Sequence, residues 1–296
     1  MRRLAFMLAI VCIGMSALAA SDSFSPNPAW LRTELKKMGF RKSFIKESLD
    51  NYDPDSFEIV MKLNLLGFLQ PPQHMDRVTP QSVRETASFM QDNRAFFAKA
   101  EKKYKVPPNV ISALLWIETR HGEDRGRFQV VSVYLHLLQA DRAVNRKHLT
   151  DLALKINEKE KDYTKKELKK LMAERAKKRH EWAQEQLQVL AQIHRHKQLD
   201  LKNLKGSFAG AFGIPQFIPS SYHQYARSAN PKTSPDLTRP SDAIMSVANY
   251  LSKSGWSNRR SKARIEALMK YNNSRDYADS ILEISRQAAG SVAVTP

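Results

Sequence analysis

Apolar residues recur every three or four positions along most of the chain beyond residue 20, the spacing of helices that bury one face. The segments with this pattern are 29–40, 41–50, 56–70, 79–106, 109–121, 241–254 and 262–289. Residues 128–135 fit either a buried strand or a buried helix, because a short apolar run has no diagnostic period. The pattern predicts a mainly α fold with little or no β structure.

Residues 141–180 are the most charged part of the chain, with 14 lysines and arginines against seven aspartates and glutamates. Opposite charges recur four residues apart, which supports an exposed helix. Two interpretations remain open, a solvated helix or an arm that binds an anionic partner. Since runs of charge usually mark solvated faces, we expect a long solvated helix, inserted into the surrounding fold.

The first 19 residues have the features of a secretory signal peptide. Arg2 and Arg3 precede an apolar run that ends in Ala-Leu-Ala at 17–19, a pattern that signal peptidase cleaves. An uncleaved membrane anchor is the alternative, because the apolar run approaches spanning length. The polar residues that follow favour cleavage. We therefore expect an exported, periplasmic protein without stable membrane insertion.

The only cysteine, Cys12, lies within this signal sequence. A mature chain that begins at residue 20 would therefore contain neither a thiol nor a disulfide. No later segment is long and apolar enough to suggest a membrane span.

The formal net charge of +18 at pH 7 is the unusual feature of the composition. The hydrophobic share of 42% and the charged share of 26% are ordinary for a protein with a sizeable core. A strongly basic chain favours nucleic acid, an acidic lipid surface or an anionic polymer as its partner. Export argues against nucleic acid.

Glu118 is the strongest candidate for a catalytic group. In a helix over 109–121, Ile111, Leu114 and Leu115 share its face. Apolar neighbours raise the pKa of a carboxyl because burial disfavours its charged form, and the helix C-terminus acts in the same direction. Such a group is a suitable general acid near neutral pH. The alternative is a buried glutamate paired with a structural arginine or lysine.

The stretch GSFAGAFGIPQFIPSSY at 206–222 concentrates small residues and two prolines. Glycines allow other atoms to approach the backbone closely, and the prolines stiffen the turn. Gln216 and Phe217 combine an amide with an aromatic face, a pairing that suits a sugar. The alternative is a tight contact between helices with no ligand.

Four motifs occur in a fixed order along the chain. They are WIETRHG at 116–122, LKGSFAGAFGIPQFIPSSYHQYA at 204–226, DAIMSVANYL at 242–251 and KYNNSRDYA at 270–278. This set resembles the lytic murein transglycosylases of the MltB type (glycoside hydrolase family 103). The resemblance covers roughly residues 85–285 and, more loosely, the helices before them. It implies a lysozyme-like helical catalytic domain and a peptidoglycan substrate.

The resemblance and the N-terminal pattern together divide the chain into four parts. They are a signal peptide (1–19), an N-terminal helical region (20–84), a lysozyme-like transglycosylase domain (85–287) that contains the charged insertion, and a flexible tail (288–296).

The resemblance also implies roles for individual residues. Glu118 matches the family's catalytic acid and base. The positions that match groove or sugar-subsite residues are Ser207, Gln216, Phe217, Tyr250, Tyr271, Asn272 and Tyr277. Aromatic core packing is the alternative for the tyrosines. The resemblance favours the subsite role most for Tyr271 and Asn272, and less for Tyr250.

The chain departs from the family pattern between 228 and 242. Many members have a calcium loop rich in aspartate there. This chain has Ser228, Asn230, Lys232 and Ser234 at the alternating positions, and Asp242 at the end. A lysine among hard oxygen ligands is incompatible with calcium. We therefore expect no metal site and no cofactor, and we expect prolines to stiffen the loop instead.

The sequence thus predicts a peptidoglycan lytic transglycosylase with a single catalytic glutamate. By the resemblance, it cleaves the β-1,4 bond between MurNAc and GlcNAc and leaves 1,6-anhydroMurNAc ends. Glu123 and Asp124 lie past the helix and are expected to be exposed. Two alternatives stay open, a lysozyme-type hydrolase with the same site and a non-catalytic peptidoglycan-binding protein. We expect glycan strands as the partner, no nucleic acid, and a monomer.

Overall fold

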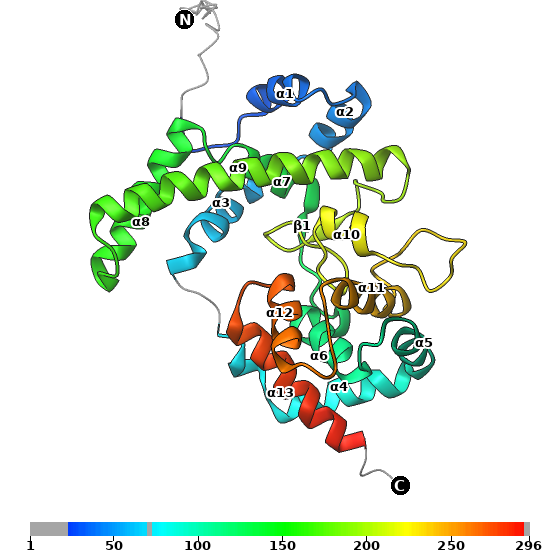
Figure 1. Ribbon diagram of the computed structural model, residues 1–296. Helices are drawn as coiled ribbons and strands as arrows, with labels where there is room; N and C mark the ends of the chain where they lie inside the picture. Colours follow the sequence, from blue (N-terminus) through cyan, green and yellow to red (C-terminus); the bar gives the residue numbers. More distant parts are fainter. Residues whose placement is uncertain (1–22, 70–72, 293–296) are drawn as a thin grey trace, which may run out of the picture.

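The computed structural model describes residues 23–69 and 73–292, and within them it is almost entirely helical (Figure 1). The α-helices are α1 (Pro28–Lys37), α2 (Lys42–Asp50), α3 (Phe57–Leu66), α4 (Pro80–Asp92), α5 (Arg94–Tyr104), α6 (Pro108–Thr119), α7 (Val130–Leu138), α8 (Ala143–Glu160), α9 (Lys165–Arg195), α10 (Pro219–Tyr225), α11 (Pro240–Lys253), α12 (Ser261–Tyr271) and α13 (Arg275–Val292). The 3-10 turns are η1 (Pro54–Ser56), η2 (Gly67–Leu69), η3 (Met75–Arg77) and η4 (Arg120–Gly122). The predicted signal peptide and Cys12 lie outside the described residues.

Two very short strands form the only sheet of the described residues. β1 (Phe128–Gln129) pairs antiparallel with β2 (Lys205–Gly206), with Phe128 opposite Gly206. The ambiguous segment 128–135 therefore divides into this strand and the first part of the buried helix α7. The prediction of a mainly α fold with little β structure is confirmed.

The helices pack as two groups around one continuous apolar core. In the first group, α7 contacts α9 and α3, and α9 also contacts α8. In the second, α4, α6 and α13 pack on one another, α11 packs on α5, and α12 packs on α13. Figure 1 shows the long helix α9 crossing the molecule between α1 and α2 on one side and the second group on the other. The expected boundary after residue 84 falls inside α4.

The charged segment forms a hairpin, so the prediction of one long helix was wrong. Lys161 adopts a left-handed conformation (φ 58°) and ends α8. The Asn157 side chain donates to the Tyr163 carbonyl (2.7 Å) and accepts from the Tyr163 amide (3.1 Å), which closes the turn. Thr164 and Glu167 then form a reciprocal capping box that starts α9.

The hairpin is also not solvated on all sides. Leu149 and Ala153 of α8 and Leu168, Met172 and Ala176 of α9 are buried, because this face packs against the core formed with α3 and α7. The apolar positions on α9 are four residues apart, with lysines between them. The lysines dominate the composition and obscure a sparse but regular apolar stripe.

The last helix extends into the segment predicted as a flexible tail. Helix α13 continues to Val292, and Ala288 is fully buried within it. The buried stripe of this helix ends at Ala288, and Ala289 and Gly290 are exposed. Residues 293–296 lie outside the described residues.

The buried stripe of α9 generates a stability prediction. Leu168→Ala is expected to lower the free energy of unfolding by about 2–4 kcal/mol, because it removes a fully buried side chain and leaves a cavity. Lys169→Ala, its exposed neighbour, is expected to stay within about 0.5 kcal/mol of the unsubstituted chain. Urea unfolding followed by circular dichroism measures both, and equal effects would contradict the packed hairpin.

Candidate active site

Helix α6 carries the candidate acid at its C-terminal end. Pro108 occupies the first helical position, where its missing N–H costs nothing. Ile111, Leu114 and Leu115 are fully buried, as predicted for the face that Glu118 shares. Glu118 itself is half-buried in the last turn, so its carboxyl lies at the border of the core.

Three consecutive residues after α6 have left-handed backbone conformations: Arg120 (φ 48°), His121 (φ 58°) and Gly122 (φ 107°). This conformation costs a residue with a side chain about 1–2 kcal/mol, so the turn needs support from its surroundings. The His121 ring stacks on Phe89 (centroids 3.9 Å apart) and lies 3.0 Å from the Ser112 carbonyl oxygen. These contacts fix the turn that follows the glutamate.

The small-residue loop after β2 packs beside this turn. Phe212 and Phe217 exchange backbone hydrogen bonds of 2.9 and 3.1 Å, and the Thr119 hydroxyl donates to the Ile214 carbonyl (2.8 Å). Gly210 has no room for a side chain, because a Cβ there would lie 2.5 Å from the Tyr134 ring. Gly210 therefore allows close approach by protein atoms. This agrees with the alternative given for residues 206–222, a tight contact with no ligand.

The Glu118 carboxyl has one hydrogen-bond partner among the described residues, the hydroxyl of Tyr277, which donates to Oε1 over 2.5 Å. Burial raises the pKa of Glu118 to about 7, and this outweighs the lowering by the Tyr277 hydrogen bond and by the positive charge of Arg77. No lysine or arginine among the described residues forms an ion pair with Glu118. Arg77 instead donates to the Ile117 carbonyl (2.7 Å).

The structure therefore disfavours the structural alternative for Glu118. A glutamate kept for an ion pair would have a lowered pKa, whereas the pKa of Glu118 is raised. Burial also raises the pKa of Tyr277, so its hydroxyl keeps its proton and remains a donor to Glu118.

Four of the predicted subsite residues form one aromatic cluster. The ring centroids of Tyr271 lie 4.7 Å from Tyr250, 5.8 Å from Phe217 and 6.4 Å from Tyr277. Phe217, Tyr250 and Tyr277 are 1%, 8% and 1% exposed, so their rings face protein and offer no platform to a sugar in this conformation. For Tyr250 and Tyr277 this burial agrees with core packing, the alternative given for the tyrosines, and the subsite roles stay a prediction. Tyr271 is half-buried, and its hydroxyl donates to the Pro215 carbonyl.

The remaining predicted residues are accessible but lie in separate contacts. The Ser207 hydroxyl accepts from the Ala211 amide (3.3 Å). The Gln216 amide donates to the carbonyls of Gly213 (2.9 Å) and Arg125 (3.2 Å), and its own backbone is left-handed (φ 49°). Asn272 is exposed at the end of α12. These three residues therefore make no direct contact with the Glu118 carboxyl.

A cavity of about 370 Å³ opens at Glu118. It is lined by Arg77, Trp116, Ile117, Glu118, Thr119, Arg120, Glu123 and Asp124. Glu123 and Asp124 are exposed, as predicted, yet they share this cavity with the candidate acid. A protonated carboxyl at the wall of such a cavity can donate a proton to a bound ligand and later accept one.

Sequence reasoning missed the residues that support the glutamate from outside its own motif. Arg77 lies in a short 3-10 turn 41 positions before Glu118, and no periodic pattern marks it. Thr119 and His121 lie within the WIETRHG motif, but their partners Ile214 and Phe89 are far away in the sequence. Only the three-dimensional contacts assign these residues a role.

The loop at 228–242 does not fit a calcium ion. Asp242 is buried and already accepts from the backbone amides of Ala229 (2.8 Å) and Asp236 (2.9 Å). The Lys99 ammonium donates to the Ala229 carbonyl (2.8 Å), which places a positive charge beside the loop and disfavours a second cation there. Within the described residues, no group of three or more histidine, cysteine, aspartate or glutamate side chains is arranged to hold a metal.

Asp242 is therefore expected to stabilise this loop without a cation. Asp242→Ala should lower the free energy of unfolding by about 1–3 kcal/mol, because two half-buried backbone donors lose their acceptor. Asp242→Asn keeps one oxygen and should lose less. Added calcium should leave the melting temperature unchanged, since a ligand stabilises only a state that it binds. A calcium-dependent rise in calorimetry would contradict this.

The Tyr277 hydrogen bond is expected to set the titration of Glu118. Tyr277→Phe should raise the pKa of Glu118 further, because that bond favours the ionised carboxyl. Tyr225→Phe is the matched control, since Tyr225 packs on Tyr250 and does not contact Glu118. Carbon-detected NMR of labelled glutamate side chains measures the shift. An unchanged titration in Tyr277→Phe would refute the contact.

Comparison with known proteins shows which family the chain resembles. The family model described as Transglycosylase SLT domain matches residues 23–265. The Escherichia coli K12 protein named membrane-bound lytic murein transglycosylase B is 31% identical over 179 residues, which cover 60% of this chain and 40% of that protein. The chain thus spans less than half the length of this relative.

Solved structures show the same fold at low identity. The Escherichia coli lytic transglycosylase SLT35, in complex with bulgecin A, aligns with a TM-score of 0.65 at 21% identity, over 91% of this chain and 94% of that one. SltB3 of Pseudomonas aeruginosa, in complex with NAG-anhNAM-pentapeptide, aligns with a TM-score of 0.64 at 18% identity, over 89% and 78%. Since the family model matches well over half of the chain, the chain belongs to the transglycosylase SLT domain family.

Proposed function

We propose that the chain is an exported lytic transglycosylase of peptidoglycan in which Glu118 acts first as general acid and then as general base. One observation carries this proposal. The Glu118 carboxyl lines a cavity, and its pKa is about 7. It accepts a hydrogen bond from the Tyr277 hydroxyl, which stays protonated, and it forms no ion pair with the described residues. A carboxyl with this pKa is divided between its two forms near neutral pH, as the double role requires.

In the first step, Glu118 donates its proton to the glycosidic oxygen between MurNAc and GlcNAc. The bond from C1 of MurNAc to that oxygen breaks, and GlcNAc leaves as an alcohol. The positive charge that develops at C1 resembles an oxocarbenium ion. Glu118 is now ionised, and the hydroxyl of Tyr277 stabilises it.

In the second step, the Glu118 carboxylate removes the proton of the C6 hydroxyl of the same MurNAc. The C6 oxygen then bonds to C1 and closes the 1,6-anhydro ring. Glu118 regains its proton, so the cycle consumes no water and needs no second carboxyl. The raised pKa assists the return of this proton, because burial makes the carboxylate a stronger base than an exposed glutamate.

The relatives support this reaction class. The protein that is 31% identical is named a lytic murein transglycosylase, and the SltB3 structure is a complex with NAG-anhNAM-pentapeptide. The stem peptides of peptidoglycan carry carboxylates, and these complement the net charge of +18.

The expected location follows from the first 19 residues, which have the features of a cleaved signal. We propose the periplasm as the place of action and a monomer as the working form. None of the helices within residues 23–69 and 73–292 has the length and the apolar character needed to cross a bilayer.

Hydrolysis is the second candidate, and one observation favours it. Glu123 and Asp124 line the same cavity as Glu118, so a second carboxyl is available to activate water. In a lysozyme-type reaction this water would take the place of the C6 hydroxyl. The two reactions differ in the mass of the product.

The test is the digestion of purified peptidoglycan sacculi by the purified chain, with mass spectrometry of the soluble products. We expect muropeptides lighter by one water than their hydrolysed counterparts. Glu118→Gln should lower the rate of release by about 10²–10⁴-fold, the contribution of general acid–base catalysis. The rate should fall as the pH rises through about 7, because Glu118 then loses the proton that the first step needs.

A variant of the neighbouring carboxyls separates the two candidates. Glu123→Gln/Asp124→Asn should leave the anhydro product mass unchanged, because the proposed reaction uses neither group. Hydrated products that disappear in this variant would establish the hydrolase instead. Full activity of Glu118→Gln would exclude both, and binding of sacculi without any release would indicate a non-catalytic wall-binding protein.

A further inference from the structure

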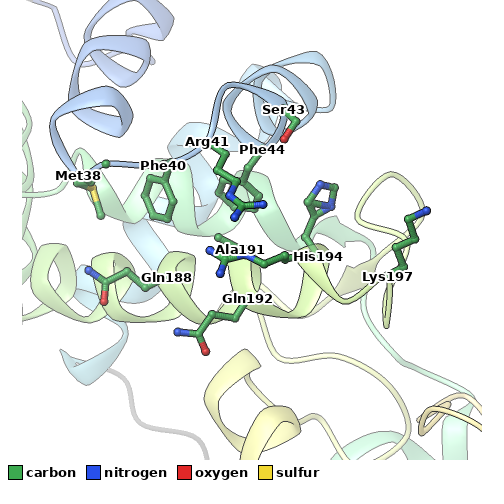
Figure 2. Close-up of a pocket in the computed structure, with 12 residues that line it drawn as sticks. Met38, Phe40, Arg41, Ser43, Phe44, Gln188, Ala191, Gln192, His194 and Lys197 are labelled. Atoms are coloured by element: carbon green, nitrogen blue, oxygen red, sulfur yellow. The ribbon is translucent and has the colours of Figure 1, made fainter.

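A second cavity, of about 490 Å³, lies between the turn that joins α1 to α2 and the C-terminal turns of α9 (Figure 2). We call it the α2–α9 groove and define it by residues 38–44 on one side and 188–197 on the other. It shares no lining residue with the Glu118 cavity. Its volume is in the range of sites that bind small ligands.

The side formed by residues 38–44 has an apolar part beside Arg41 and Ser43. Phe44 is buried, Met38 and Phe40 are half-buried, and the rings of Phe40 and Phe44 lie 5.1 Å apart. In Figure 2, Met38 and Phe40 point from the turn towards helix α9. These side chains can cover small apolar groups such as methyls.

The opposite side is one face of α9. Gln188, Ala191, Gln192 and Arg195 line the groove at positions i, i+3, i+4 and i+7, which share a helix face. The two glutamine amides can each donate to and accept from the peptide groups of a ligand. His194 lies 3.5 Å from Glu47 of α2, and this contact joins the two sides.

The groove also gathers cations without partners. Arg41, Arg195 and Lys197 are exposed, and none of their side chains forms an ion pair or a hydrogen bond with any residue the structure describes. The lining includes no aspartate or glutamate. Most other lysines and arginines that approach a carboxylate do so along their own helix, as in the pairs of Lys147 and Lys177. The groove is therefore open to an anionic ligand.

We infer that the α2–α9 groove binds the carboxylate-bearing stem peptide of peptidoglycan, at a site apart from the cavity of Glu118. This rests on the proposed function, which makes peptidoglycan the partner. The cations meet the peptide's carboxylates, the glutamine amides meet its peptide groups, and the apolar part meets its methyl groups. A bare inorganic anion would leave the apolar part and the amides unused.

Such a site would hold the protein on the wall while Glu118 acts on a glycan strand. Two linked contacts raise the effective concentration of the second one, provided that both can be made at once. Residues of α2, of α9 and of the turn between α1 and α2 would then contribute to retention on the wall, and residues of α6 to bond cleavage.

The test measures the binding of a free stem tetrapeptide to the purified chain by isothermal titration calorimetry. Arg41→Gln/Arg195→Gln should weaken binding about tenfold or more, because it removes charge-assisted hydrogen bonds. Lys169→Gln/Lys178→Gln is the matched control. It removes the same charge from exposed positions on α9 outside the groove, and it should leave the dissociation constant unchanged.

A second arm varies the peptide. The same tetrapeptide with its carboxylates converted to amides should bind to the unsubstituted chain as weakly as the free peptide binds to the groove variant. Equal losses in both variants, or equal binding of the amidated peptide, would overturn the inference. So would equally tight binding of a glutamate oligomer of the same charge, since that would show charge attraction alone.

These measurements separate this inference from the proposed function. The tetrapeptide has no glycosidic bond, so its binding does not depend on Glu118. If the proposed function fails, the unsubstituted chain releases no product from sacculi, whatever the peptide binding. If the groove inference fails, peptide binding is the same in both double variants while cleavage of sacculi persists.

Discussion

The proposed chemistry depends on one carboxyl group, that of Glu118, which is half-buried at the end of an apolar helix. The fully buried side chains on the same face of α6 raise the pKa of Glu118 to about 7. The Tyr277 hydroxyl opposes this shift without cancelling it, because a neutral donor stabilises a carboxylate less than a salt bridge would. Replacement of Tyr277 by a lysine or arginine would keep Glu118 ionised and would remove the acid.

The fold keeps this balance by fixing the end of α6 with contacts from several elements. Arg77 reaches the Ile117 carbonyl, Thr119 bonds the small-residue loop, and the His121 ring lies on Phe89. The left-handed turn after the helix is unfavourable by itself, so these contacts are needed to maintain it. This turn ends the helix one residue after Glu118 and leaves the carboxyl at the wall of a cavity rather than inside the core.

How far the sequence predicts this arrangement depends on how local each signal is. The helical segments and the apolar face of Glu118 follow from local spacing, and the structure confirms both, except that 79–106 and 262–289 each contain two helices. The aromatic residues Phe217, Tyr250 and Tyr277 match groove or sugar-subsite positions by the resemblance, and in the structure their rings are buried. A motif specifies that these rings stand near the glutamate. It does not specify whether a ring faces solvent or faces another helix, since that depends on α11, α12 and α13 packing together.

The charged segment was predicted as one solvated helix, and the effect of Arg77 on Glu118 was not predicted. Both errors arise because the contacts that decide them join residues without a clear sequence pattern. Helix α9 buries one residue in four over its first turns, and lysines hide this stripe in any average over the segment. Arg77 acts on Glu118 through space, and no periodicity joins two such positions.

The loop at 228–242 is a case in which the sequence alone was enough, because the charge of Lys232 disfavours a calcium ion. In the structure, the Lys99 ammonium and the Asp242 carboxylate complete the loop's hydrogen bonds from within the chain. The sequence therefore predicts which residues disfavour a ligand more readily than it predicts which distant residues contact one another.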